Sequence, residues 1–138
     1  MNTNEIIKNL PALFCALFVA ILFIQSGLDK VFDWKGNLDW LTGHFSKSFL
    51  APFVTPMLAT VTLMEIATGV LAAVGIIYFL ATGSLSLIVY ASIIGAASIT
   101  ALFFGQRVAK DYAGAAVLVP YFILLVILMI LTNPFVKN

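Results

Sequence analysis

One acidic residue, Glu65, lies deep inside a long apolar run of this chain, between Met57 and Gly75. A carboxyl group at that depth in a bilayer is costly unless it takes up a proton or finds a partner, so acids in membrane spans mark ligand, ion or proton sites. Glu65 is therefore the first candidate for chemistry. The alternative is a neutral or paired structural acid that fixes the register of two helices.

Several polar groups elsewhere in the chain are spaced to meet Glu65. Gln25 stands one turn before the end of the first apolar run, where it can share a hydrogen bond with a protonated acid. Lys30 follows just beyond that run, and Arg107 or Lys110 can reach back from the end of the third. A lysine or arginine would form a buried ion pair with the acid. We expect Glu65, Gln25 and Lys30 to form a proton or ligand contact, with Arg107 a secondary candidate.

Three further residues are secondary candidates. Asp111 and Tyr112 open the fourth apolar run, and Asp111 is predicted to cap that helix and to interact with its dipole. His44, the only histidine, lies in a predicted surface segment and cannot by itself supply both axial ligands of a b-type haem. Cys15 is the only cysteine, which excludes an internal disulfide or dithiol relay. No metal-ligand spacing and no intrinsic cofactor motif is found in the sequence.

Composition indicates which solvent surrounds these residues. The chain has 138 residues, of which 62% are hydrophobic and 9% charged, and its mean hydropathy is +1.11. Such a chain has too few charges to cover a soluble globule. Four runs are long enough to cross a bilayer, at about residues 10–28, 57–79, 84–104 and 113–132. We predict a single transmembrane domain over residues 1–138. The first run lacks a cleavage pattern and is expected to be retained. A net charge of +1 gives no reason to expect nucleic acid as a partner.

The long connection between the first two spans is predicted to hold a short helix at about residues 37–49. Asn37 is its predicted N-cap. Four apolar side chains then fall on one helical face, namely Leu38, Leu41, Phe45 and Phe49. Trp34 and Trp40 are the residue type that favours the headgroup region. The segment is interpreted as a connector lying on the membrane, with a lid over a cavity between the helices as the sharper alternative.

Connectivity places most polar residues on one membrane face. The end of span one, the start of span two, the end of span three and the start of span four must share that face. Glu65 lies about 12 Å from the start of its predicted helix, in the same half of the bilayer. Five basic residues mark this face and two mark the other, namely Lys30, Lys35, Lys47, Arg107 and Lys110 against Lys8 and Lys137. The positive-inside rule therefore places the polar face in the cytoplasm.

A stripe of small and polar residues in the second span predicts that Glu65 points into the bundle. Its members are Thr62, Glu65, Thr68, Gly69 and Ala72. Such stripes allow helices to pack closely, while branched aliphatic side chains on the opposite side meet lipid. We expect Gly69, and Gly27 at the end of span one, to lie at helix contacts. The predicted fold is an all-α integral membrane four-helix bundle with a short interfacial amphipathic helix between spans one and two.

The segment Phe23–Asp33 and the segment Glu65–Gly75 resemble the DoxX family of small four-helix membrane proteins. Gly27, Lys30 and Glu65 are among the family-like residues, together with Gly69. The resemblance implies a compact bundle in a bacterial inner membrane, associated with redox complexes such as a thiosulfate:quinone oxidoreductase or with soluble redox-defence proteins. It also implies that both termini lie in the cytoplasm, which conflicts with the charge count.

Three functions remain open from the sequence. The first is a membrane subunit of a quinone-linked oxidoreductase, in which Glu65 and Gln25 lie at the polar end of a cleft that holds a quinone. Electrons would then come from a membrane or soluble redox partner. The second is a non-catalytic scaffold or accessory subunit of a larger membrane complex. The third is a small-solute or proton pathway, which would require a homo-oligomer. Membrane lipid is an expected partner in every case.

Overall fold

The computed structural model describes residues 2–134, and its regular structure is entirely helical over that range. The elements in chain order are α1 (Thr3–Lys8), α2 (Leu10–Phe32), α3 (Trp34–His44), the 3₁₀ turn η1 (Ala51–Phe53), α4 (Val54–Thr82), α5 (Ser86–Val108) and α6 (Tyr112–Thr132). The prediction of an all-α fold is confirmed.

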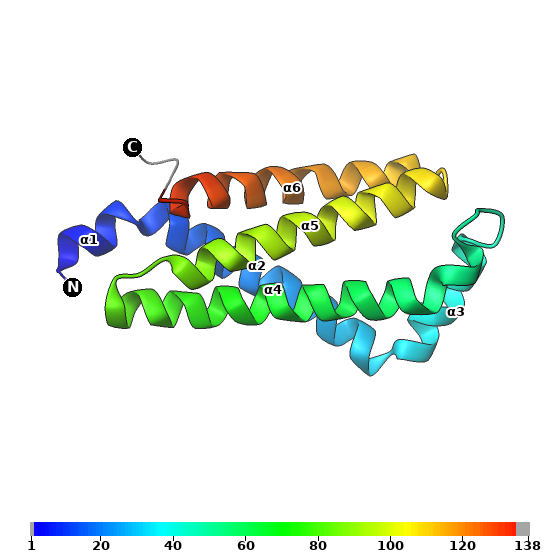
Figure 1. Ribbon diagram of the computed structural model, residues 1–138, viewed down its shortest axis with the longest axis horizontal. Helices are drawn as coiled ribbons and strands as arrows, with labels where there is room; N and C mark the ends of the chain where they lie inside the picture. Colours follow the sequence, from blue (N-terminus) through cyan, green and yellow to red (C-terminus); the bar gives the residue numbers. More distant parts are fainter. Residues whose placement is uncertain (1, 135–138) are drawn as a thin grey trace.

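Four helices, α2, α4, α5 and α6, lie side by side as an elongated bundle (Figure 1). Each of the four is long and apolar enough to cross a membrane. The predicted spans match them, but α2 continues to Phe32, α4 covers Val54–Thr82 and α5 ends at Val108. These extra turns carry polar residues beyond the apolar runs, so hydropathy alone did not reveal them. The protein is a multi-pass membrane protein with a helical bundle fold.

The two ends of the bundle differ in their connections. One end, on the right in Figure 1, holds α3, the start of α4 and the loop between α5 and α6. The other end holds the N-terminal α1 and the turn between α4 and α5. Gly83 makes this turn with a φ of 78°, a conformation that only glycine adopts without strain. The polar face expected from connectivity is the end with α3; Lys137, counted for the opposite face, lies outside the described residues.

The interfacial helix begins earlier and ends earlier than predicted. It covers Trp34–His44, directly after a one-residue break at Asp33. Asn37 is therefore not its N-cap; the Asn37 amide lies inside the helix and donates to the Asp33 carbonyl at 2.8 Å. Phe45 and Phe49 follow the helix, so they do not share a helical face. Phe45 is buried and Phe49 is 67% exposed. The helix begins early because Asp33 alone separates the end of α2 at Phe32 from the start of α3 at Trp34.

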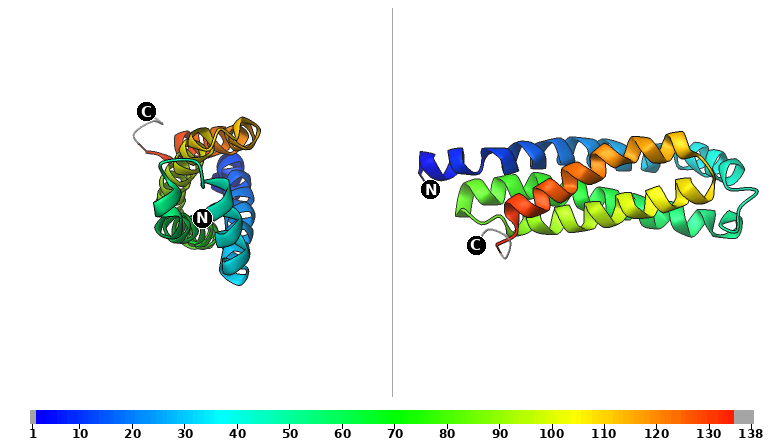
Figure 2. Two further views of the ribbon diagram at one scale, coloured as in Figure 1. Left: turned by 90° about the vertical axis from the view of Figure 1, so that its right-hand side faces the viewer. Right: turned by 90° about the horizontal axis from the view of Figure 1, so that it is seen from above.

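Small side chains on the inner faces let the long helices approach closely. The buried core includes several alanines of α2, α4 and α5 together with a few larger side chains, among them Ala12, Ala16, Ala72, Ala91, Phe23, Ile88 and Leu125. Neighbouring helices in the chain pack along most of their length, in the order α2, α4, α5 and α6 (Figure 2). This arrangement places the inner faces of α2 and α4 against each other at the level of Glu65.

Candidate functional site

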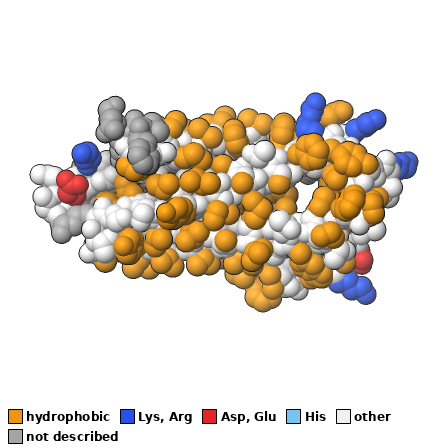
Figure 3. All heavy atoms as spheres, viewed as in Figure 1, with side chains coloured by type: hydrophobic (Ala, Val, Ile, Leu, Met, Phe, Trp, Pro, Cys, Tyr) orange, Lys and Arg blue, Asp and Glu red, His pale blue; other side chains and the backbone are white. Residues whose placement is uncertain are grey.

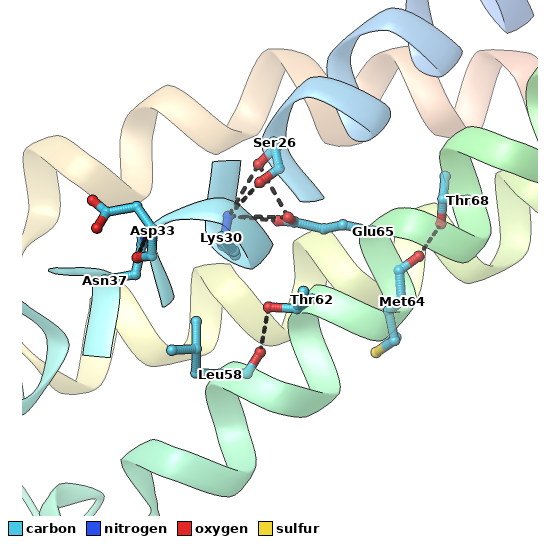
Figure 4. Close-up of polar contacts among 9 residues, drawn as sticks. All are labelled: Ser26, Lys30, Asp33, Asn37, Leu58, Thr62, Met64, Glu65 and Thr68. Atoms are coloured by element: carbon cyan, nitrogen blue, oxygen red, sulfur yellow. Dashed lines mark hydrogen bonds and ion pairs between the residues drawn. The ribbon is translucent and has the colours of Figure 1, made fainter. Parts of the chain in front are cut away.

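Glu65 and Lys30 form an ion pair inside the bundle. The Lys30 Nζ lies 3.0 Å from Glu65 Oε2 and 3.3 Å from Oε1, and the Glu65 side chain is only 3% exposed. The Ser26 hydroxyl donates to Glu65 Oε2 at 3.0 Å and accepts from Lys30 Nζ at 3.0 Å. Figure 4 shows these three side chains converging from α2 and α4. The buried carboxyl group thus has both a counter-charge and a hydroxyl donor.

Two glycines bring α2 and α4 close enough for this contact. A Cβ at Gly27 would lie 2.6 Å from the Ile66 side chain and 3.6 Å from Glu65 Cβ. A Cβ at Gly69 would lie 2.7 Å from the backbone nitrogen of Ile24. Both helices therefore approach through backbone where a larger residue could not fit. Gly27 precedes Lys30 by three residues and Gly69 follows Glu65 by four, so in these antiparallel helices both glycines lie about one turn deeper in the bundle than the ion pair.

Gln25 is not brought to Glu65. Its side chain lies on the exposed face of α2, and Ser26, the next residue, takes the place that was expected for it. Successive residues of a helix differ by about 100° in direction, so an error of one residue changes the face. Ser26 could have been found by its spacing, because it stands four residues before Lys30 and therefore on the same face.

An apolar cavity of about 250 Å³ lies beside Lys30, between α3, the start of α4 and the end of α5. Lys30 contributes the charged group of its lining, and α3 contributes Trp40, Leu41 and Phe45. The walls come from α4 and α5, through Val54, Met57, Leu58, Val61, Ala101, Leu102 and Gly105, and polar atoms come also from Asn37 and Gln106. Figure 3 shows a hollow at this end of the molecule, framed by hydrophobic side chains. The cavity is thus an apolar space with a charged donor in its wall.

His44 connects α3 to the end of α5 and the start of α6. Its Nε2 lies 2.8 Å from Gln106 Oε1 and 3.7 Å from Asp111 Oδ2. The Trp40 ring stacks on the imidazole with a centroid distance of 4.5 Å, and the edge of Phe45 meets it at 5.2 Å. The sequence predicts a surface residue here, because a lone histidine stands on an amphipathic interfacial segment. Its partner Gln106 lies 62 positions further along the chain. In the structure the histidine joins α3 to the corner between α5 and α6.

The remaining secondary candidates lie at the connection between α5 and α6 and make no contact with the ion pair. Asp111 caps α6, as predicted, by accepting from the Gly114 backbone N–H at 2.9 Å. The Arg107 guanidinium lies over the Tyr112 ring, 4.4 Å from its centroid. Lys110 adopts a left-handed φ of 61° that turns the chain between the two helices. Arg107 and Lys110 therefore do not act as the partners of Glu65.

One buried hydroxyl is unused. Ser98 is fully buried on α5, one turn deeper than the cavity-lining residues Ala101 and Leu102, and its Oγ has no hydrogen-bond partner among residues 2–134. Buried hydroxyls in helices of this kind are usually satisfied, as at Thr62 and Thr68, which donate to carbonyls one turn back on α4. Across the described part of the chain no cluster of three His, Cys, Asp or Glu side chains could hold a metal ion.

The fold and the site define a class: a multi-pass helical membrane protein in which the first two spans cross at glycines and enclose a lysine–glutamate pair. The DoxX family model matches residues 12–98, which is more than half of the chain. The chain belongs to the DoxX family. The matched region includes Ser26, Lys30 and Glu65 and stops before Gln106 and Asp111. No match was found among curated proteins or among solved structures.

Proposed function

We propose that this chain is the membrane-embedded subunit of a quinone-linked redox complex in a bacterial inner membrane, and that the cavity beneath α3 receives the quinone ring. One observation carries the proposal: Lys30 lines the cavity and is at the same time the partner of Glu65. The Lys30 amino group can therefore donate to a ligand in the apolar cavity while it remains paired with the buried Glu65. Perturbed or paired ionisable groups in such clefts are typical of binding sites.

The cavity suits a single ring better than a larger molecule. Its volume of about 250 Å³ is slightly below that of pockets that enclose drug-sized ligands, which begin at about 300 Å³. Apolar side chains from α4 and α5 form the walls, and Trp40 and Phe45 form an aromatic roof. A ring can stack on such a roof while an isoprenoid tail remains in the surrounding lipid.

The residues of the chain can position a carbonyl oxygen and hold a proton beside it. The Lys30 Nζ has three N–H donors, and the weakest of its present contacts, to the Ser26 carbonyl, is 3.5 Å long. A carbonyl in the cavity can replace that contact while the bonds to Glu65 and the Ser26 hydroxyl remain. Glu65 holds the Lys30 amino group in position through contacts of 3.0 and 3.3 Å. A bound quinone would supply the capacity to accept two electrons and two protons.

In this proposal the electrons come from a separate redox protein, either membrane-embedded or soluble. The chain has one cysteine and one histidine, which suits an accessory role beside a partner that carries the electron-transfer group. The end that holds α3 is the face on which such a partner would bind, because the cavity and its roof lie there (Figure 1).

The test is quinone binding by purified protein. Quinone extracted from protein purified in mild detergent is quantified by mass spectrometry, and titration of a short-chain quinone gives the affinity. We expect the double variant Lys30→Met with Glu65→Gln to bind at least about tenfold more weakly, because a hydrogen bond from a charged donor is lost. Lys35→Met, an exposed lysine of α3, is the matched control and should bind normally. If neither purified protein nor protein in vesicles binds quinone, the proposal is wrong.

A scaffold role is the second candidate, and a specific observation favours it. Lys30 and Glu65 satisfy each other and Ser26 entirely within the bundle, as a structural pair would. The variant Leu102→Trp distinguishes the two functions, since it fills the cavity and leaves Lys30, Glu65 and Ser26 unsubstituted. For a quinone site, ring binding is lost; for a scaffold, co-purification of partner subunits and activity of the complex stay unchanged.

A further inference from the structure

The outer face of α2 carries a regular apolar stripe that no other part of the described chain covers. Its residues alternate in steps of four and three, namely Phe14, Phe18, Ile21, Gln25, Leu28 and Phe32. All six are exposed, from 39% at Leu28 to 83% at Phe32 for the apolar members. Figure 2 shows α2 along one edge of the bundle, with its outer side free. A four–three repeat is the spacing by which two helices pack along a continuous seam.

Gln25 is the polar member of this stripe and lacks a partner. Its amide makes no hydrogen bond within residues 2–134, and exposed apolar residues lie on both sides of it along the helix, Ile21 before and Leu28 after. By contrast, the exposed threonines Thr60 and Thr100 donate to carbonyls of their own helices at 2.8 Å. An amide facing hydrocarbon loses its hydrogen bonds to water, so a protein partner at this position is favourable.

We propose that this face is a dimer interface, in which α2 pairs in parallel with α2 of a second copy of the chain. Two copies inserted in the same orientation are related by a two-fold axis along the membrane normal, so their Gln25 residues meet at equal depth. An amide both donates and accepts, and therefore each Gln25 can bond the other reciprocally. With Gln25 at an a position of the seam, this single polar pair fixes register, as buried polar residues do in parallel coiled coils.

The surroundings of the seam agree with a second copy as the occupant. Beside the stripe, α2 and α4 form a shallow groove with Leu17, Ala20, Ile24 and Ala73 in its lining, into which side chains of a facing helix can insert. Asp29 is exposed at the headgroup end, one residue after Leu28. In a parallel pair such a flanking residue faces the side of the partner helix and not its own copy, so the two carboxylates stay apart.

The dimer is independent of the cavity. Ser26, Gly27 and Lys30 point into the bundle, away from the stripe, so pairing through Gln25 leaves the ion pair in place. Loss of the dimer and loss of quinone binding are therefore separate outcomes. A variant of Gln25 is expected to change the association of the protein and to leave the cavity intact.

The experiment is disulfide cross-linking of purified full-length protein in liposomes at a high lipid ratio. The background variant Cys15→Ala removes the native thiol. Ile21→Cys places a thiol on the seam, and Ile93→Cys, 47% exposed on α5, is the matched lipid-facing control. We expect oxidation to give a covalent dimer for Ile21→Cys and not for Ile93→Cys. Equal cross-linking at both positions, or none at position 21, would overturn the proposal.

A second measurement tests the role of the amide. Dimer dissociation is followed by energy transfer between labelled copies, for wild type, Gln25→Leu and the control Thr100→Val. Each interhelical hydrogen bond corresponds to a factor of roughly 3 to 30 in the dissociation constant, so Gln25→Leu, which removes the reciprocal pair, should weaken the dimer by at least that factor. Thr100→Val should not change the dissociation constant. If the Gln25→Leu dimer dissociates with the wild-type constant, the amide does not join the two copies, and the pairing proposed for Gln25 is wrong.

Discussion

At the scale of single residues, Lys30 and Glu65 affect stability and ligand binding as a pair. Glu65 is 2% exposed and α2 supplies both of its hydrogen-bond donors, Lys30 and Ser26. Burying one charge alone is costly, whereas a pair with correct geometry offsets much of that cost. The same pair can therefore stabilise the fold and offer a donor to a ligand.

This coupling predicts a characteristic pattern of stabilities. Lys30→Met alone leaves a buried carboxylate without its counter-charge and should lower the free energy of unfolding by about 3–5 kcal/mol. The double variant Lys30→Met with Glu65→Gln removes both charges and should recover most of that loss. Equilibrium unfolding in mixed micelles measures each value. Additive losses in the double variant would show that the two side chains do not interact.

The sequence was sufficient to find Glu65 and Lys30 but not their neighbours. A charge inside an apolar run stands out from composition alone, and the two residues fall in the same half of the bilayer by counting. Ser26 was missed in favour of Gln25 because the choice between adjacent residues needs the rotation of α2 about its axis. The contact between His44 and Gln106 joins distant segments, so only the packed structure shows it.

At the scale of elements, glycine positions decide how closely the helices pack. Helix existence and order were predicted correctly because long apolar runs with short connections leave few alternatives. Helix ends were predicted less well, since the last turns of α2 and α5 are polar. The start of α3 was also misplaced, because one residue, Asp33, suffices to separate it from α2.

Two glycines with opposite surroundings test the packing of α2 on α4. Gly69→Ala places a Cβ 2.7 Å from the Ile24 backbone nitrogen, which cannot move aside as a side chain would. We expect a loss of about 1–3 kcal/mol in unfolding free energy, measured by thermal or denaturant unfolding in detergent. Gly43→Ala is the control, because a Cβ added at this position on α3 would have nothing within 4 Å. Equal effects at both positions would mean that close packing at Gly69 does not limit stability.

At the scale of the whole molecule, charge is gathered at one end. The space-filling view shows most lysines and arginines at the end with α3, and a smaller group near α1 (Figure 3). This distribution favours a cytoplasmic location of the α3 end, whereas resemblance to the family implied that the termini are cytoplasmic. With four spans, the α3 end and the turn between α4 and α5 lie on opposite sides of the membrane in either orientation.

Thiol labelling from the two sides of sealed vesicles tests that relation. In the background Cys15→Ala, the variant Lys47→Cys marks the α3 end and Ser84→Cys marks the turn between α4 and α5. A membrane-impermeant maleimide should label one of them from outside and the other only after the vesicles are opened. Labelling of both from the same side would contradict the four-span topology. The side on which Lys47→Cys reacts assigns the orientation.

The long sequence separation of the roof contact has a consequence for biosynthesis. Lys30 and Glu65 are 35 positions apart, so both are available once the first two spans have been made. The contact of His44 with Gln106 can form only after α5 has been synthesised, because Gln106 lies 62 positions further along the chain. Since chains are synthesised from the N-terminus, the ion pair can form early and α3 can be fastened only at the end. A truncated chain that stops after α4 would contain the pair of Lys30 and Glu65 but would lack the α5 wall of the cavity and the contact between His44 and Gln106.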